Sequence, residues 1–194
     1  MDFQEALETA FVNMIVAEGI TVVQGSLPVV SINARNCKRM YDGRPDPTAG
    51  NFFVSVWSRN FKRARDRNAI DETFRCFATV TRRFDQRPFD RWVTYRDEVD
   101  KLLSQVIAVG MRDSWSWTIS NEMNRIAGFT WQPGDTTKRI GAAEALYFEE
   151  ASDIVDVGPD WFNAGADSQS GAMPGCQATA RFIMRRVQNI LTAR

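Results

Sequence analysis

Five basic residues stand within nine consecutive positions, and the chemistry open to them is the binding of anions: Arg59, Lys62, Arg63, Arg65 and Arg67. Their hydrogen bonds to carboxylates or phosphates are charge-assisted, so we predict that they contact a partner or line a DNA channel. Attraction to phosphates needs no particular base sequence. Phe61 alone offers a ring among them, which disfavours a single-stranded partner. A solvated loop tip is the alternative interpretation.

A second group of residues combines arginine, proline and aromatic side chains in one predicted turn, the segment DQRPFDRW. Arginine and aromatic residues are enriched at the centres of protein interfaces, so these residues are predicted to form a subunit interface: Arg87, Phe89, Asp90, Arg91 and Trp92. The alternative is that Asp85 and Asp90 pair with the arginines of the same turn and only fix its shape.

The chain contains no histidine, the side chain that most often moves protons near neutral pH. A serine or cysteine nucleophile would then need a lysine base, and Lys38, Lys62 and Lys101 all stand in strongly charged surroundings. Neither a Walker-type phosphate loop nor a glycine-rich dinucleotide motif occurs. We therefore expect no catalytic residue and no cofactor.

A metal-dependent nuclease of the PD-(D/E)xK type would need a Pro-Asp pair and an acid-x-Lys motif on neighbouring strands. Pro45 and Asp46 supply the first part. The nearest acid and lysine considered for the second part, Glu98 and Lys101, are spaced three apart in a predicted helix. We expect no metal site, and Pro45 and Asp46 are expected to shape a turn.

The composition is that of a globular domain, with 194 residues, 44% of them apolar and 25% charged. The formal net charge is zero, yet the charges are segregated. Bases outnumber acids about two to one between Arg35 and Arg91, whereas 1–19 and 141–167 carry acids only. Such poles suit head-to-tail or ring assembly, with two solvated faces as the alternative.

Three well-separated cysteines form no C-x-x-C pair, and we expect reduced, partly buried thiols: Cys37, Cys76 and Cys176. The acidic, amphipathic beginning of the chain lacks the basic start and apolar run of a secretory signal. No stretch approaches the roughly 18 apolar residues of a membrane span. The sequence predicts a protein made in the cytoplasm, with no membrane partner.

Helical spacing of apolar residues predicts amphipathic helices over 2–18 and 95–111, with Asp2 and Thr94 as N-caps. A third amphipathic stretch, 177–191, is predicted as a C-terminal helix. Its arginines would lie on the wet side of that helix.

Strands are predicted at the β-branched runs 20–23 and 27–33, at FFVSVW (52–57), and at 73–84. In the last of these, alternation places on one face Phe74, Cys76, Ala78 and Val80. The segment 41–51 is a predicted loop. Weaker strand signals lie at 35–40, where a helical turn is the alternative, and at 114–117, 129–131 and 145–148.

These elements predict an α+β fold: a small, mostly antiparallel sheet flanked by helices, with long hairpin loops and a C-terminal helix. The core domain is placed at 1–118 and includes a basic hairpin at 59–72. An acidic, loop-rich insertion or lobe is predicted over 119–176, and a C-terminal helix over 177–194 packs on the core.

The order of these elements, with the phrases GRPDPTAG, FFVSVW and IDETFRCFATVTRRFDQRPFDRW, resembles the neck or tail-completion proteins of tailed bacteriophages, especially tail terminators. The resemblance covers about 2–113. It implies a non-enzymatic virion protein that forms a homo-oligomeric ring, expected to be a hexamer, in the neck or tail after assembly in the host cytoplasm. The implied partners are other neck, portal-side and tail-tube proteins, with transient non-specific contact to packaged double-stranded DNA.

Two alternatives stay open. One is another head-tail connector ring, of the head-closure (stopper) or adaptor type, although adaptors tend to be helical. The other belongs to a different class, a metal-dependent nuclease or DNA-processing enzyme.

Overall fold

The computed structural model describes residues 2–22, 30–44, 50–66, 69–84, 92–112, 119–126, 146–158 and 175–189. Its elements are α1 (Phe3–Ala17), β1 (Thr21–Val22), β2 (Val30–Ser31), β3 (Cys37–Arg39), η1 (Tyr41–Gly43), β4 (Phe52–Asp66), β5 (Ala69–Arg83), α2 (Trp92–Gly110), α3 (Ile119–Arg125), β6 (Tyr147–Ala151), β7 (Val155–Val157) and β8 (Gly175–Asn189).

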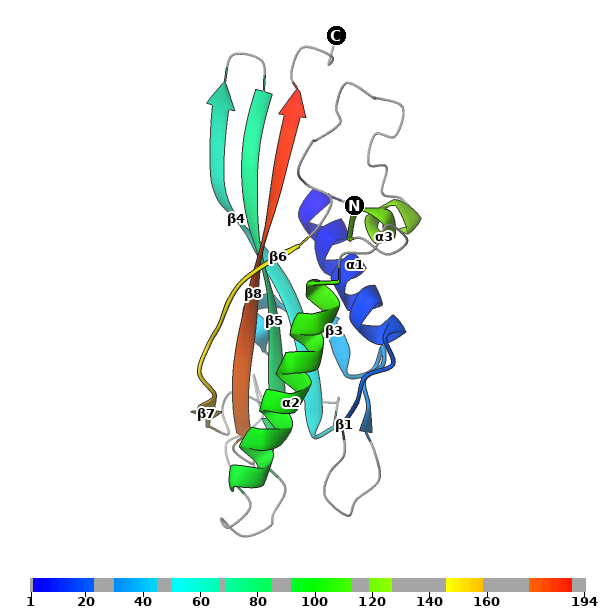
Figure 1. Cartoon of the computed structure of the whole chain (residues 1–194), viewed down its shortest axis with the longest axis vertical. Helices are drawn as coiled ribbons and strands as arrows, with labels where there is room; N and C mark the ends of the chain where they lie inside the picture. The colour runs from blue at the N-terminus through cyan, green and yellow to red at the C-terminus, as the bar shows by residue number, and fades with distance from the viewer. Residues whose placement is uncertain are drawn as a thin grey trace, which may run out of the picture.

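One main sheet, with strand order β3-β4-β5-β8-β6, carries α1 and α2 on one of its faces (Figure 1). β7 also pairs with β8, and β1 pairs with β2 in a separate ladder. Every pair is antiparallel except β3 with β4. The predicted α+β class and the mostly antiparallel sheet are confirmed.

Helix α1 forms as predicted because both its cap and its apolar stripe are present. The Asp2 carboxylate accepts the backbone N–H of Glu5 at 2.7 Å, and the chain leaves the helix at Gly19, whose φ is +66°. The apolar stripe is buried against the sheet, where the Phe3 ring lies 4.7 Å from Phe74 and the Phe11 ring 5.1 Å from Phe182. The helix therefore packs mainly over β3 and β4, and its two phenylalanine rings reach β5 and β8.

A buried carboxylate also ties α1 to the sheet. Glu8, 9% exposed, accepts the backbone N–H and the hydroxyl of Ser58, each at 2.8 Å. Its other oxygen accepts from Arg39 Nε at 3.1 Å. One side chain thus links α1 to β4 and β3, and both of its carboxylate oxygens accept hydrogen bonds.

The predicted alternation in β5 is confirmed, because the four apolar residues on the helix-covered face are all at most 4% exposed: Phe74, Cys76, Ala78 and Val80. Helix α2 packs over β5 and β8. Its backbone comes so near β8 that a Cβ added at Gly110 would lie 2.4 Å from the Phe182 ring. The Thr94 cap is wrong, since α2 begins at Trp92.

The C-terminal helix predicted over 177–191 is also wrong, because β8 occupies Gly175–Asn189 in the interior of the sheet. Its buried residues recur at every second position: Cys176, Ala178, Ala180, Phe182 and Met184. This is the period of a strand. The short side chains of Ala178 and Ala180 suit the close approach of α2.

Other expectations were met in part. Strands were found at 21–22, 30–31, 37–39 and 147–151, and the predicted loop 41–51 includes the short helix η1. The signals at 114–117 and 129–131 lie outside the described residues. Buried residues of the predicted lobe 119–176 belong to the main core. They are Ile119 and Met123 of α3 and Leu146, which directly precedes β6.

Candidate interaction surface: a basic three-stranded arm

Strands β4, β5 and β8 continue past the layer of helices and form an arm that projects from the body (Figure 1). We define the arm as residues 59–66, 69–75 and 183–189. Seven of its residues are basic: Arg59, Lys62, Arg63, Arg65, Arg75, Arg185 and Arg186. Three are acidic: Asp66, Asp71 and Glu72. The arm is therefore a net cationic extension.

Four of the five predicted contact residues lie on β4 of this arm, and Arg67 lies outside the described residues. The predicted basic hairpin at 59–72 is present and is ladder over most of its length, since β4 runs to Asp66 and β5 starts at Ala69. A bulge between Asn60 and Lys62 shifts the register. Lys62 then pairs with Thr73 and Arg63 with Glu72, so neighbouring cations alternate between the two faces of the arm.

Glu72 is the polar centre of the arm. It is 7% exposed, it lies 3.3 Å from Arg63 Nε, and it accepts from Asn60 Nδ2 at 3.3 Å. On its other side the register places it opposite Arg186 of β8. Glu72 lies on β5, between the basic strands β4 and β8. Its negative charge offsets the repulsion between the cations of these two strands and so stabilises the arm.

Reasoning from the sequence missed the contribution of β8, which brings Arg185 and Arg186 to the arm. Both were expected on the wet side of a helix. The register places Arg185 opposite Thr73 and Arg186 opposite Glu72. The available signal was the alternation of apolar residues from Ala178 to Met184 described above.

The base of the arm is stiffened by arginines that lie on aromatic rings. The rings of Trp57 and Phe77 stack with centroids 3.9 Å apart, and the Arg59 guanidinium carbon lies 4.9 Å from the Trp57 ring. Arg75 lies 3.6 Å from the ring of Phe61, the residue at the bulge. Guanidinium groups thus cover ring faces that a nucleobase would need for stacking, and the arrangement favours contact with anions instead.

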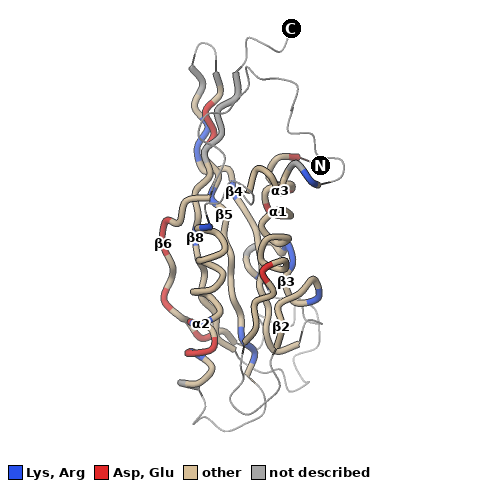
Figure 2. Tube along the Cα trace, turned by 45° about the vertical axis from the view of Figure 1, so that its right-hand side comes forward, with Lys and Arg blue, Asp and Glu red and all other residues tan. Residues whose placement is uncertain are grey.

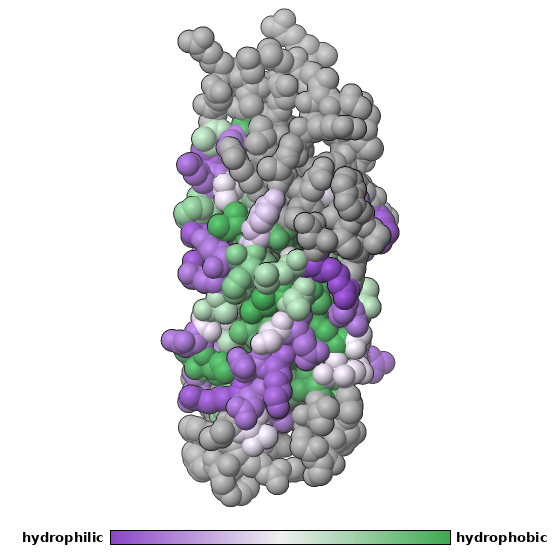
Figure 3. Space-filling view, viewed as in Figure 1, coloured by the Kyte–Doolittle hydropathy of each residue, from purple (hydrophilic) through white to green (hydrophobic). Residues whose placement is uncertain are grey.

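The opposite charge collects on β6, β7 and the turn between them, which we call the acidic edge (147–157; Figure 2). It contains four acids and no lysine or arginine: Glu149, Glu150, Asp153 and Asp156. Exposed apolar side chains lie among them, with Tyr147 56%, Phe148 37% and Val155 48% exposed. In Figure 3, hydrophilic and apolar residues accordingly alternate along the margin where β6 and β7 lie.

The acidic edge is joined to the base of the arm within the same copy. Arg75 Nη2 lies 3.2 Å from Glu149 Oε1, and Arg181 of β8 pairs with both Glu149 and Glu150. Asp156 pairs with Arg96 of α2 at 2.9 Å.

The second predicted contact group cannot be placed. Arg87, Phe89, Asp90 and Arg91 lie outside the described residues, and the backbone of Trp92 begins α2.

Of the residues weighed for a metal site, the structure gives a contact for Glu98. Pro45 and Asp46 lie outside the described residues, and Glu98 pairs with Arg82 at 2.9 Å. Within the described ranges no three His, Cys, Asp or Glu side chains form a group that could hold a metal ion. The cysteines are free and buried as predicted, and burial raises the pKa of Cys37 and Cys176 to about 12.

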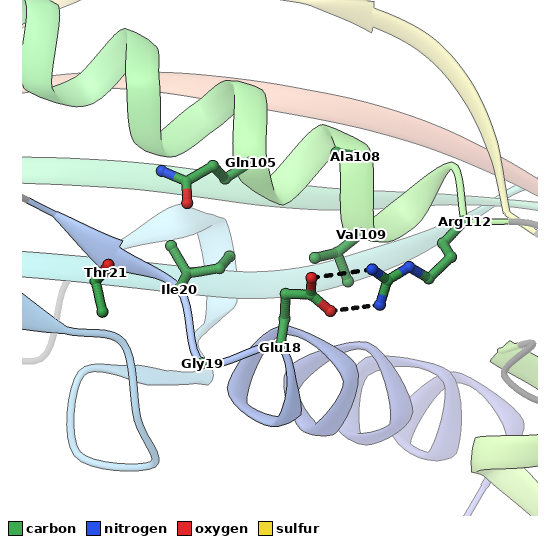
Figure 4. A pocket seen from close by; sticks show the side chains of 8 residues that line it. All are labelled: Glu18, Gly19, Ile20, Thr21, Gln105, Ala108, Val109 and Arg112. Atoms are coloured by element: carbon green, nitrogen blue, oxygen red, sulfur yellow. Dashed lines mark hydrogen bonds and ion pairs between the residues drawn. The ribbon is translucent and has the colours of Figure 1, made fainter.

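A hollow of about 330 Å³ lies where the end of α1, β1 and α2 meet (Figure 4). Its two charged residues form an ion pair with two hydrogen bonds. Arg112 Nη2 donates to Glu18 Oε1 at 3.0 Å, and Arg112 Nη1 donates to Glu18 Oε2 at 2.5 Å. Ile20 and Val109 form part of the remaining wall. The Glu18–Arg112 ion pair thus links the end of α1 to the end of α2.

Among the described residues, no helix combines the length and apolar character needed to cross a membrane. Comparison of the chain with protein-family models and with curated proteins gives no match.

Proposed function

We propose that this chain is a non-enzymatic structural protein that joins copies of itself into a ring, as a tail terminator or related neck component of a tailed-phage virion. The observation that carries this proposal is that one sheet bears both a projecting basic arm and, at another place, an acidic edge. Surfaces of opposite charge at different places on one chain favour heterologous contacts, and such contacts close into rings when the rotation between copies allows it.

The arm also supports a role facing DNA. Its cations are carried on strands whose base is fixed by arginine–aromatic contacts, so they reach outward on a stiff support. Contact with phosphates would be independent of base sequence and weakened by salt. In a ring, arms that faced the channel would touch packaged double-stranded DNA only transiently.

The test is the size and shape of the purified protein. Light scattering and negative-stain electron microscopy should show closed rings, alone or after addition of neck or tail-tube proteins. A monomer that cuts DNA with Mg²⁺ would contradict the proposal and favour the nuclease class. Co-sedimentation with tail tubes supports the terminator type, whereas co-sedimentation only with portal-side proteins supports another connector ring.

A further inference from the structure

We infer that the acidic edge of one copy pairs with the free edge of β4 in the arm of the next copy, so that one sheet continues from copy to copy. This interface rests on the proposed ring assembly and names the surfaces that would build it.

The first of the two edges is β6. It ends the strand order of the main sheet, and within the part of the chain that the structure describes it pairs only with β8. Its exposed Tyr147 and Phe148 stand beside Glu150, which is also exposed. A strand edge with exposed apolar side chains is a template for another strand.

The second edge is the arm portion of β4. β3 pairs with β4 only at Val54, Ser55 and Val56, so beyond that point β4 has a partner on one side only, β5, among the described residues. This stretch carries the basic residues of the arm, and Lys62 and Arg63 are exposed. Among the described residues, two strand edges of opposite charge therefore lack a further strand partner.

The directions of the strands agree with cyclic symmetry. β4 is antiparallel to β5, β5 to β8, and β8 to β6, so β6 runs opposite to β4. By the ladder registers, β6 lies level with residues 56–59 of its own β4, at the base of the arm. A ring axis inclined to the strands, with the tilt and stagger of a closed sheet, keeps the sense of every strand and shifts the arm of the next copy to the level of β6. The β4 strand of a neighbour would then run antiparallel to β6, which is the more common type of pairing.

Charge selects this pairing over its competitors. Two acidic edges repel each other, as do two arms, whereas an arm and an acidic edge attract. Each edge also carries an irregularity, one between Asn60 and Lys62 and one between Phe148 and Glu150. Bulges discourage indiscriminate edge pairing, so attraction between matched charges would set the partner and the register.

The test uses two single charge reversals, Lys62→Glu on the arm and Asp153→Lys on the acidic edge. Both residues are exposed. Each variant alone should lose most of its assembly, because like charges meet at every contact. An equimolar mixture should recover it, since the reversed arm fits the reversed edge and the unchanged arm fits the unchanged edge. The controls Lys101→Glu and Asp100→Lys make the same charge changes on the exposed side of α2 and should assemble normally.

Hydrogen exchange adds a direct readout of strand pairing. Backbone amides of 147–151 and 59–65 should exchange at least several-fold more slowly in the assembly than in the dissociated wild-type protein. Reversed variants that assemble like wild type, or a mixture that recovers nothing, overturn this interface while leaving ring assembly intact. A wild-type protein that stays monomeric under all conditions, with or without neck partners, overturns the proposed function and the interface together.

Discussion

Arg82 on β5 and Glu98 on α2 form an ion pair in the core, with side chains 1% and 7% exposed and Arg82 Nε donating to Glu98 Oε2 at 2.9 Å. The guanidinium carbon also lies 4.6 Å from the Phe52 ring centroid and 4.5 Å from that of Tyr95. Two aromatic rings and a carboxylate thus surround one buried cation. The contact fixes α2 on the sheet, because the pair joins the two directly.

Removing one member of this pair should be costly. Arg82→Met leaves the Glu98 carboxylate buried without its cation, and we expect a loss of about 3–5 kcal/mol in the free energy of unfolding, measured by urea denaturation. The matched control is Arg96→Met, which breaks the half-exposed Arg96–Asp156 pair on the same helix and should cost below about 1 kcal/mol. Equal losses for the two variants would show that burial does not decide the effect.

Alanine substitutions at Gly43 and Gly50 distinguish the cost of backbone strain from the cost of a steric clash. Their φ angles are +70° and +77°, so alanine is strained at both positions. A Cβ at Gly43 would also lie 2.6 Å from Thr79 Oγ1, whereas at Gly50 nothing lies within 4 Å. Gly43→Ala should therefore destabilise the fold by about 1–3 kcal/mol more than Gly50→Ala, by the same measurement. A smaller or reversed difference would mean that η1 moves away from the sheet freely.

The thiols predict how stability changes with pH. Burial raises the pKa of Cys37 from its ordinary 9.0 to about 12, so the folded thiol keeps its proton where the unfolded one releases it. The contribution of this thiol to the free energy of unfolding is fully present below pH 9. It is lost as the pH rises toward 12. Between pH about 8 and about 10 the loss per thiol should be about 1 kcal/mol.

The control for this pH effect is Cys37→Ala, in which the fall over the same pH range should be smaller by the share of one thiol. Because a neutral thiol is a poor nucleophile, native protein at neutral pH should also resist alkylation by iodoacetamide. Rapid alkylation of Cys37 without denaturant would contradict its burial.

Glu72 should control the order of the arm more than the stability of the body. Replacing its carboxylate by an amide, Glu72→Gln, removes the negative charge that pairs with Arg63. Amides of 62–66 and 70–74 should then exchange faster by roughly threefold to tenfold, as expected for about 1 kcal/mol of local destabilisation. Amides of α1 should not change. Lys62→Gln removes charge without removing this carboxylate and should leave the exchange of the arm near that of wild type.

Helix α1 and strand β5 were predictable because local pattern and tertiary burial agree there. Asp2 caps the helix, and from Phe74 to Val80 every second residue enters the core. β8 was misassigned because Phe182, Ile183 and Val187 are also compatible with helical spacing. The alternation from Ala178 to Met184 was a competing local signal for a strand, and pairing with β5 and β6 decides between the two patterns.

The candidate surface was predictable only in part for the same reason. The cations of β4 are adjacent in sequence, so Lys62 and Arg63 were recognised at once. Arg185 and Arg186 join them through pairing with β5, and the acidic edge lies in the same sheet through pairing with β8. Both depend on contacts between distant segments. The buried roles of Glu8 on α1 and Glu72 on β5 were missed because their polar partners lie on β4, a different element in both cases.

The position of β8 has a consequence for how the chain folds. The hydrogen bond between Thr79 and Thr179 joins residues 100 positions apart, and the whole β5–β8 ladder spans comparable separations. Closing such a long loop is slow compared with forming the β4–β5 hairpin. During synthesis, β5 must therefore wait for β8 to leave the ribosome, and a chain interrupted before then can neither complete its core nor present a finished arm to a neighbour.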